Sequence, residues 1–237
     1  MNAAALALWT ATLLDPKATV AQRNDACYAL RGNRSQEAVA ALTQAIGDKT
    51  VRACAARDLA EAGAVEALLQ ALAAEDPDTR LAAASELGSL RDPRALEPLG
   101  RAAMDDNLLV SAAAVGALGA YDQRALPMLL RASEQLNVTG VAALEGAARF
   151  HDPTVVRAAR RVLVQGDVAA QVIALSVLME QGDATDLPKL RELAAKSEPV
   201  ASRTRGFGFM PVIDVGRAAK NAMEAIERKL SANSYQP

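Results

Sequence analysis

The chain repeats one pattern of about 28–31 residues at least six times, and this repeat constrains its fold more than any other feature. The clearest copy, DPDTRLAAASELGSLRDPRALEPLGRAAMDD, begins at Asp76. Its apolar residues follow the spacing of an α-helix on both sides of a central Asp-Pro turn. Arg23, Arg52 and Arg80 occupy the same position in three successive copies. Each copy therefore predicts a hairpin of two helices.

The apolar residues of the chain are unusually small. Of 237 residues, 54 are alanine, and 51% are hydrophobic but only 3% aromatic. Alanine is the strongest helix former and is depleted in strands, which predicts an all-α fold. A single hairpin cannot bury its own apolar stripe, so the copies are expected to stack on one another.

Turn residues mark where the helices are expected to begin and end. Asp92-Pro93 and Asp152-Pro153 are typical of helix starts, because aspartate accepts from free N–H groups and proline loses no bond there. Gly32, Gly63 and Gly182 fall at the expected ends of first helices. We expect a left-handed backbone conformation at all three glycines.

The repeated segment resembles the bacterial HEAT repeat of the phycobilisome-lyase-like type, over roughly residues 17–197. The resemblance implies an all-α, right-handed α-solenoid of about six to seven HEAT-like helical hairpins, with second helices lining a concave face. Such repeats usually serve as protein-binding scaffolds. A minority are enzymes, namely bilin lyase subunits and a DNA glycosylase family.

We expect one solenoid over residues 1–237. Its expected parts are an N-terminal helix and cap at 1–16, six repeats at 17–197, an irregular loop at 198–211, a capping helix at 212–230 and a tail at 231–237.

Arginines gather on the second helices of the third to sixth copies. The predicted partner-binding residues of this face are Arg101, Arg131, Arg157, Arg160, Arg161 and Arg191. Two interpretations stay open. The arginine stems could cover alanine-rich surface while their charges stay in water. Alternatively, the guanidinium groups could bind an acidic peptide or another anion.

The segment EPVASRTRGFGFMP at 198–211 breaks the period. It contains Arg203, Arg205, Phe207 and Phe209, residue types that often anchor interfaces. These four residues are predicted to contact a partner, or else the phenylalanines cap the last apolar surface of the solenoid.

Two smaller patterns have structural interpretations. Asp48 and Asp76 each precede an arginine by four residues, so Asp48–Arg52 and Asp76–Arg80 pairs are expected along one helix. Cys27 and Cys54 lie among alanines and are expected to act as small buried apolar residues.

Several classes of function are disfavoured. The single histidine, His151, and the two cysteines argue against a metal site, and no catalytic residues or cofactor are predicted. A net charge of −2 disfavours nucleic acid. No apolar run is long enough to span a membrane. We interpret Met1–Leu14 as a first helix and not as a signal peptide, and we expect a cytoplasmic protein.

The sequence thus favours a non-catalytic scaffold that binds a protein or peptide on a concave face, and an acidic partner would suit its arginines. One alternative is a bilin-lyase-like subunit or chaperone acting on a tetrapyrrole-bearing protein. A second is a structural segment of a larger multidomain protein. The pattern does not predict an oligomeric state.

Overall fold

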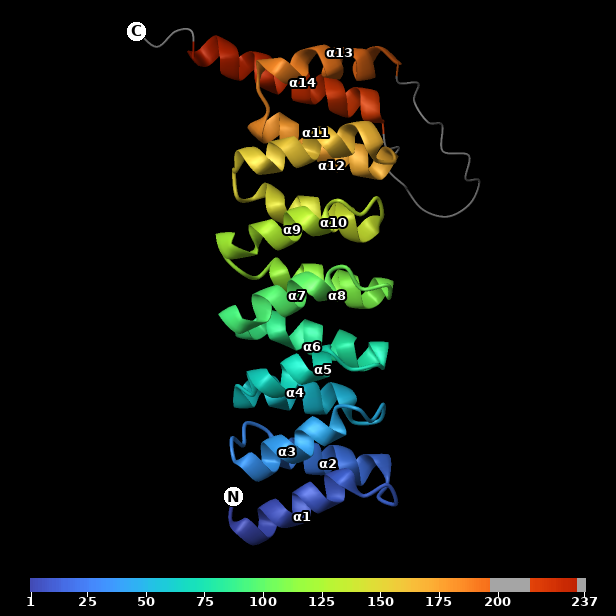
Figure 1. Cartoon of the computed structure of the whole chain (residues 1–237), viewed down its shortest axis with the longest axis vertical. Helices are drawn as coiled ribbons and strands as arrows, with labels where there is room; N and C mark the ends of the chain where they lie inside the picture. Colours follow the sequence, from blue (N-terminus) through green and yellow to red (C-terminus); the bar gives the residue numbers. More distant parts are fainter. Residues whose placement is uncertain (197–213, 234–237) are drawn as a thin grey trace. The chain divides into compact units, whose positions relative to one another are not determined.

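The computed structural model describes residues 1–196 and 214–233, and every regular element in these ranges is a helix (Figure 1). The all-α prediction is confirmed. The α-helices are α1 (Ala3–Leu14), α2 (Val20–Leu30), α3 (Gln36–Ala45), α4 (Arg52–Ala62), α5 (Val65–Leu72), α6 (Pro77–Leu90), α7 (Leu96–Ala102), α8 (Leu108–Leu118), α9 (Leu126–Ala132), α10 (Val138–Ala148), α11 (Pro153–Gln165), α12 (Val168–Gln181), α13 (Leu187–Lys196) and α14 (Val215–Asn233). The 3₁₀ segments are η1 (Pro93–Ala95), η2 (Gln123–Ala125) and η3 (Ala184–Asp186).

The chain divides into two compact units, Met1–Met128 and Leu129–Pro237, with the boundary inside α9. Each unit is described here by itself. The expected single solenoid over 1–237, with its caps and tail, stays a prediction. The expected irregular loop at 198–211 lies outside the described residues.

Both units are built as rows of stacked helices (Figure 1). In the first unit α2, α4, α6 and α8 pack in one row, and α1, α3, α5 and α7 pack in a second row against it. In the second unit α10, α12 and α14 form the row of first helices, with α11 and α13 packed on it. Successive hairpins therefore stack in chain order, as a solenoid requires.

Leucines fill the space between the rows. In the first unit each of the eight helices α1–α8 places one fully buried leucine there: Leu13, Leu30, Leu42, Leu59, Leu68, Leu87, Leu99 and Leu118. Leu129, Leu144, Leu175 and Leu178 do so in the second unit. Burying each such side chain stabilises the fold by about 1.5–3 kcal/mol.

Small side chains bring neighbouring first helices close together. A Cβ atom added at Gly88 of α6 would lie 2.8 Å from the Cα atom of Ala117 in α8. Real Cβ atoms do not approach backbone this closely, so a larger side chain would push the two helices apart. The abundance of alanine and glycine is thus a packing requirement as well as a helix signal.

The turns follow the predicted chemistry with one exception. Asp152 accepts a hydrogen bond from the Thr154 N–H at the start of α11, as expected of a helix cap. Gly32 and Gly63 have left-handed φ angles of 65° and 70°, which confirms their role. The prediction is wrong at Gly182, where φ is −70°. A Cβ atom there would lie within 2.4 Å of a carbonyl oxygen, so Gly182 serves close approach and not a left-handed turn.

Arginines at the starts of first helices tie consecutive repeats together. The expected pairs four residues apart are not formed among the described residues, and that prediction is wrong. Each arginine instead reaches the carboxylate at the start of the next repeat: Arg23 Nη1 to Asp48 Oδ2 at 2.8 Å, Arg52 Nη2 to Asp76 Oδ2 at 2.5 Å, and Arg80 Nε to Asp105 Oδ2 at 2.8 Å.

Backbone carbonyls explain why the arginines point this way. Arg23 Nε donates to the Leu13 carbonyl, in the last turn of α1, at 2.8 Å. Arg80 Nη1 likewise donates to the Glu75 carbonyl beyond the end of α5, at 2.7 Å. These bonds satisfy carbonyls that helix ends leave free and direct each guanidinium towards the next loop. The fifth copy has Gly140 at this position, where a Cβ atom would lie 1.8 Å from the Gln135 carbonyl oxygen.

We expect Gly88→Ala to lower the free energy of unfolding by about 1–3 kcal/mol, because the added methyl group strains the contact between α6 and α8. Gly116 of α8 is the matched control, since a Cβ atom there meets nothing within 4 Å. Gly116→Ala should raise stability by about 0.5–1 kcal/mol through helix propensity alone. Urea denaturation followed by circular dichroism measures both, and equal effects would contradict the packing argument.

We expect Thr50→Val to lower the free energy of unfolding by an amount that depends on pH. The Thr50 hydroxyl donates to Asp48 Oδ1 at 2.6 Å, and this bond contributes most to holding the pKa of Asp48 at about 2, below its ordinary 3.8. A lowered carboxyl pKa stabilises the fold above the ordinary value, and this stabilisation is lost as the pH falls through the folded value. Because the carboxylate is 38% exposed, screening limits the loss near neutral pH to about 0.5–1 kcal/mol.

The difference in unfolding free energy between wild type and Thr50→Val should shrink as the pH falls from about 4 to about 2. Thr43→Val is the control, because the Thr43 hydroxyl donates to the Val39 carbonyl and not to a carboxylate. Its effect should be the same at every pH. Denaturant titrations across this range test both variants, and a pH-independent Thr50 effect would refute the assignment.

Candidate functional site

The predicted binding arginines lie on four second helices. Arg101 is on α7, Arg131 on α9, Arg157, Arg160 and Arg161 on α11, and Arg191 on α13. Arg101 belongs to the first unit and the other five belong to the second. The remaining predicted residues, Arg203, Arg205, Phe207 and Phe209, lie outside the described residues.

Three of the six described arginines are exposed and form no ion pair with a carboxylate in the described part of the chain. Arg101, Arg131 and Arg157 form no ion pair within 4 Å in the ranges that the structure describes. Arg157 contributes only a weaker electrostatic attraction to Asp152. Their guanidinium groups therefore keep their donors for water or for a partner.

The other three arginines are engaged within the second unit. Arg161 Nη1 lies 3.0 Å from Glu134 Oε1, and Arg191 Nη2 lies 3.3 Å from Glu227 Oε1. These pairs are well exposed and contribute little to stability. They nevertheless reduce the positive charge that Arg161 and Arg191 present to a partner.

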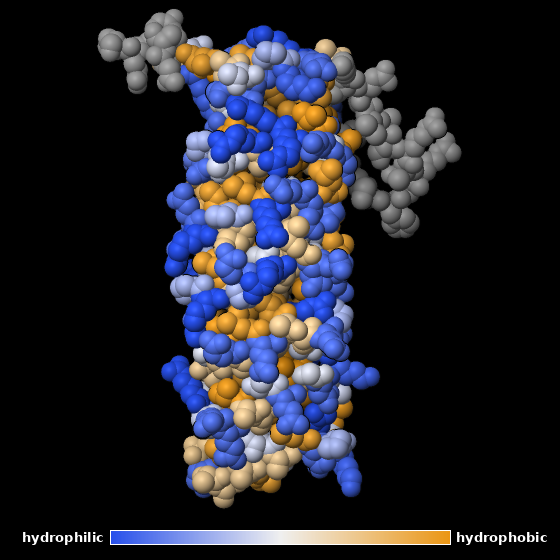
Figure 2. Space-filling view, viewed as in Figure 1, coloured by the Kyte–Doolittle hydropathy of each residue, from blue (hydrophilic) through white to orange (hydrophobic). Residues whose placement is uncertain are grey.

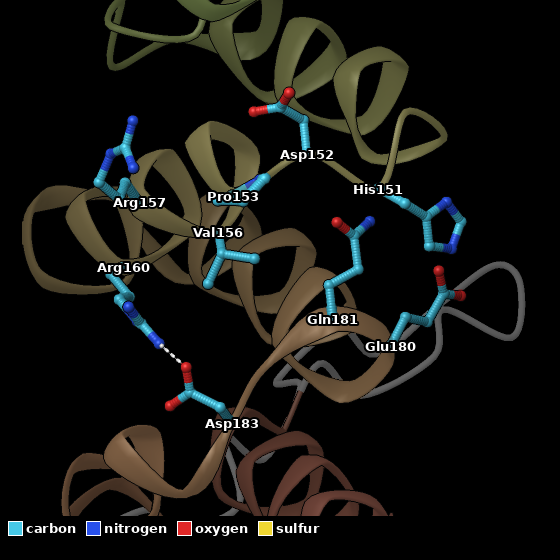
Figure 3. A pocket seen from close by; sticks show the side chains of 9 residues that line it. All are labelled: His151, Asp152, Pro153, Val156, Arg157, Arg160, Glu180, Gln181 and Asp183. Carbon is cyan, nitrogen blue, oxygen red and sulfur yellow. Dashed lines mark hydrogen bonds and ion pairs between the residues drawn. The ribbon is translucent and has the colours of Figure 1, made fainter.

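Arg160 has a structural role at the turn between α12 and α13. Its Nε and Nη2 donate to the two carboxylate oxygens of Asp186 at 2.7 and 3.0 Å. Its Nη2 also donates to Asp183 Oδ2 at 3.0 Å, as Figure 3 shows. Asp186 is only 6% exposed. The hydrogen bonds that Arg160 donates to Asp186 are the main reason that the pKa of Arg160 is raised, so this side chain remains a cation that fixes the turn.

A hollow of about 480 Å³ opens beside Arg160 in the second unit (Figure 3). Its lining carries charges of both signs. The lining residues are His151, Asp152, Pro153, Val156, Arg157, Arg160, Glu180, Gln181 and Asp183. Figure 3 shows the guanidinium of Arg157 directed away from the pair of Arg160 and Asp183.

Two carboxylates of this hollow, those of Asp152 and Asp183, are held in their charged form by hydrogen bonds. A hydrogen bond from Thr154 lowers the pKa of Asp152, and one from Thr185 lowers the pKa of Asp183. An anion placed in the hollow would face both of them. The hollow is therefore no uniform anion site, and within it Arg157 is the cation best placed to meet a partner.

The first unit has a smaller hollow of about 360 Å³ between α5 and α7. Leu69, Leu72 and Pro98 form an apolar floor, and Arg101 stands at its side. The same hollow includes Asp105, whose carboxylate is held by Arg80. An apolar floor beside an unpaired guanidinium suits a peptide side chain and its neighbouring carboxylate.

Apolar side chains also stand open at the turns that begin first helices. Figure 2 shows one face of the molecule, on which apolar and hydrophilic side chains alternate. In the second unit the strongly exposed apolar residues at such turns are Leu136, Val138, Val164 and Val168. Leu108 and Leu109 hold the corresponding place in the first unit. Apolar residues gathered at equivalent turns are typical of surfaces that contact proteins.

Sequence reasoning missed one buried cluster in the first unit. Cys27 of α2 and Cys54 of α4 are buried, as expected, but they are joined by a disulfide, and the carboxylate of Asp58 lies against both. Their donor atoms lie within 4.8 Å of one another. Metals bind cysteine as the thiolate, so the bonded pair offers no thiolate ligand.

Part of the chain matches a known family of repeats. The all-helical hairpin stack defines a helical repeat protein. The family described as HEAT repeats matches residues 65–139, from the start of α5 into α10, so this part of the chain is similar to HEAT repeats. No curated protein matches the chain.

Two solved structures are similar over most of their length. Human deoxyhypusine hydroxylase in complex with glycerol is 21% identical, with 98% of this chain and 90% of that chain covered and a TM-score of 0.45. The complex of CpcE and CpcF of phycocyanin lyase from Nostoc sp. PCC7120 is 22% identical, with 93% and 94% covered and a TM-score of 0.45. At these values neither likeness bears on what this chain binds or catalyses. No helix in the described part of the chain has the length and apolar character needed to cross a bilayer.

Proposed function

We propose that the chain is a non-catalytic scaffold whose second helices bind an acidic segment of a partner protein. The observation that carries the proposal is the set of exposed arginines that have no ion-pair partner within residues 1–196 and 214–233, Arg101 in the first unit and Arg131 and Arg157 in the second. Guanidinium groups suit carboxylates because their paired N–H donors match both oxygens.

The proposal distinguishes these three arginines from the rest of the predicted set. Arg160 is held by Asp186 and Asp183, so a partner would have to displace two carboxylates to reach it. Arg161 and Arg191 each have one exposed partner, and such pairs exchange easily with water. We assign them a secondary part in binding. Arg203, Arg205, Phe207 and Phe209 remain a proposed contact segment.

The apolar side chains at the turns support a protein as the partner. Arg131, in the last turn of α9, is followed by the exposed Leu136 and Val138. Arg161 is followed in the same way by Val164. A small anion would leave these side chains in water, whereas a protein chain could cover them while its acidic residues meet the arginines.

We expect the triple variant Arg101→Ala, Arg131→Ala, Arg157→Ala to bind a fluorescent oligo-glutamate peptide at least about tenfold more weakly than wild type, since exposed charges each contribute up to about 1 kcal/mol. Fluorescence anisotropy measures the affinity. Wild-type binding should weaken as salt is added, because the contacts are exposed charges.

The matched control removes three arginines that already have local partners. Arg94 and Arg124 are held by Asp92 and Asp122, and Arg228 donates to the Glu224 carbonyl of its own helix. The control triple alanine variant loses the same net charge and should bind within about twofold of wild type. If both variants lose affinity equally, the effect comes from net charge alone. If wild type does not bind the peptide, an acidic partner is refuted.

The tetrapyrrole alternative makes a separate prediction. A bilin-lyase-like subunit would bind a linear tetrapyrrole, and the changed environment of the pigment would shift its visible absorbance. We expect the purified chain to leave the spectrum of a free linear tetrapyrrole unchanged, because no described residue specifically favours a pigment site. A saturable shift at equimolar protein would overturn this expectation and favour the lyase-like function.

A further inference from the structure

The buried cluster between α2 and α4 combines a disulfide with a carboxylic acid. The Cα atoms of Cys27 and Cys54 are 6.3 Å apart, within the range that a disulfide spans. The side chain of Asp58 is fully buried. Cys54 and Asp58 share one face of α4, because they are four residues apart. Cys27 reaches them from the neighbouring first helix.

The carboxyl group of Asp58 is held only by two long ion pairs, from Oδ1 to Arg57 Nε at 3.5 Å and to Arg31 Nε at 3.8 Å. Its Oδ2 lies 3.4 Å from Cys27 Sγ and 3.5 Å from Cys54 Sγ, but bonded sulfurs carry no proton to donate. Its Oδ1 is buried without a hydrogen-bond partner within the described part of the chain. A buried polar group in this state is costly. Reduction of the disulfide would give Oδ2 a hydrogen-bond donor, because both thiols would face this oxygen.

We propose that Cys27 and Cys54 form a reversible dithiol–disulfide pair that exchanges with an external dithiol, and that Asp58 holds the proton that passes to sulfur when the disulfide is reduced. The site would thus serve a thiol-based reductant, a chemical class distinct from the acidic partner proposed for the second helices.

The two sulfurs differ in access, and this sets the order of events. Cys27 is fully buried, whereas Cys54 is 8% exposed. Arg57 Nη2 lies 3.5 Å from Cys54 Sγ and would stabilise a thiolate there. Cys54 is therefore the sulfur that an incoming thiolate can attack, and Cys27 is the sulfur that leaves.

The exchange balances in two steps. An external thiolate attacks Cys54 Sγ and forms a mixed disulfide. The bond to Cys27 breaks, and its sulfur takes the electron pair and the proton of Asp58. The second thiol of the reductant then gives up its proton and attacks its partner sulfur, which releases Cys54 as a thiolate. That proton restores Asp58, so the external dithiol is oxidised and the protein pair is reduced.

Charged groups from three elements surround the carboxyl group. Burial raises the pKa of Asp58, which favours the protonated acid that the first step requires. Arg57 of α4 and Arg31 at the end of α2 oppose this rise, with Nε atoms 3.5 and 3.8 Å from Oδ1. Glu61 of α4 adds to the rise. Glu86 of α6 belongs to the same charge cluster, and burial raises its pKa as well.

The experiment measures reduction of the full chain by dithiothreitol. Samples are quenched with acid, free thiols are alkylated with N-ethylmaleimide, and mass spectrometry counts zero or two adducts. Circular dichroism on the same samples reports whether the fold is kept. We expect wild type to be reduced while folded, and Asp58→Asn to be reduced at least about tenfold more slowly, because the amide cannot transfer a proton.

A pH profile separates proton transfer from a merely structural role. After correction for the thiolate fraction of dithiothreitol, the wild-type rate should rise as the pH falls through the pKa of Asp58, whereas the Asp58→Asn rate should stay flat. Asp25→Asn is the matched control, since Asp25 is an exposed carboxylate on α2 two residues before Cys27. It should keep the wild-type rate and profile.

Three outcomes would overturn the proposal. Reduction only after denaturation would make the disulfide a permanent cross-link. Two free thiols under every oxidising condition would mean that the pair never forms. Identical rates and profiles for wild type, Asp58→Asn and Asp25→Asn would leave Asp58 with no part in proton transfer.

Single-cysteine variants test the order of events independently of Asp58. In Cys27→Ser the remaining Cys54 thiol should react with iodoacetamide at least about tenfold faster than the Cys27 thiol that remains in Cys54→Ser, because Cys54 is more accessible and lies beside Arg57. Equal or reversed reactivity would refute the assigned roles of the two sulfurs. Oligo-glutamate binding is measured on the reduced and oxidised forms as well. Its affinity tests the acidic partner alone, whereas the thiol reactivities test the cysteine pair alone.

Discussion

The close approach of neighbouring first helices is the constraint on which the rest of the structure depends. Gly88 against Ala117 shows how little room remains between α6 and α8. Side chains this small allow each helix of the first unit to place one fully buried leucine between the rows. Large and charged residues are left to the ends of helices and to outward faces. Many of the ion pairs, the open arginines and many of the exposed apolar side chains therefore lie at turns and along the second helices.

The helices could be predicted from residues close together in the sequence. The contacts between repeats could not be predicted in this way. Helical spacing and the Asp-Pro turns indicated the hairpins because those signals lie within a few residues of one another. The partners of Arg23 and Arg80 were missed because the deciding carboxylates lie 25 residues further along the chain. Which carboxylate is reached depends on how one loop lies over the next. Gly182 shows a related limit, because close approach and left-handed backbone both select glycine.

The candidate site divides along the same line. Its arginines could be assigned to second helices by counting from each core position. Which of these arginines lack an ion-pair partner could not be predicted, because the partners come from other elements. Glu134 pairs with Arg161 in this way, and Glu227 pairs with Arg191. Only part of the cysteine cluster could be predicted from the sequence, namely that Cys54 and Asp58 lie together, since they are one helical turn apart. The arrival of Cys27 depends on the register between α2 and α4.

The bond between α2 and α4 has a mechanical consequence. In a stack where each repeat contacts only its neighbours, hairpins can peel away from an end one at a time. The disulfide joins the first helices of two consecutive hairpins, 27 residues apart in sequence. Fraying that begins at α1 must then open both hairpins together or stop before them. Amide protons of α2 and α4 would share one opening rate in the oxidised chain. Once the disulfide is reduced, the two helices would open at different rates.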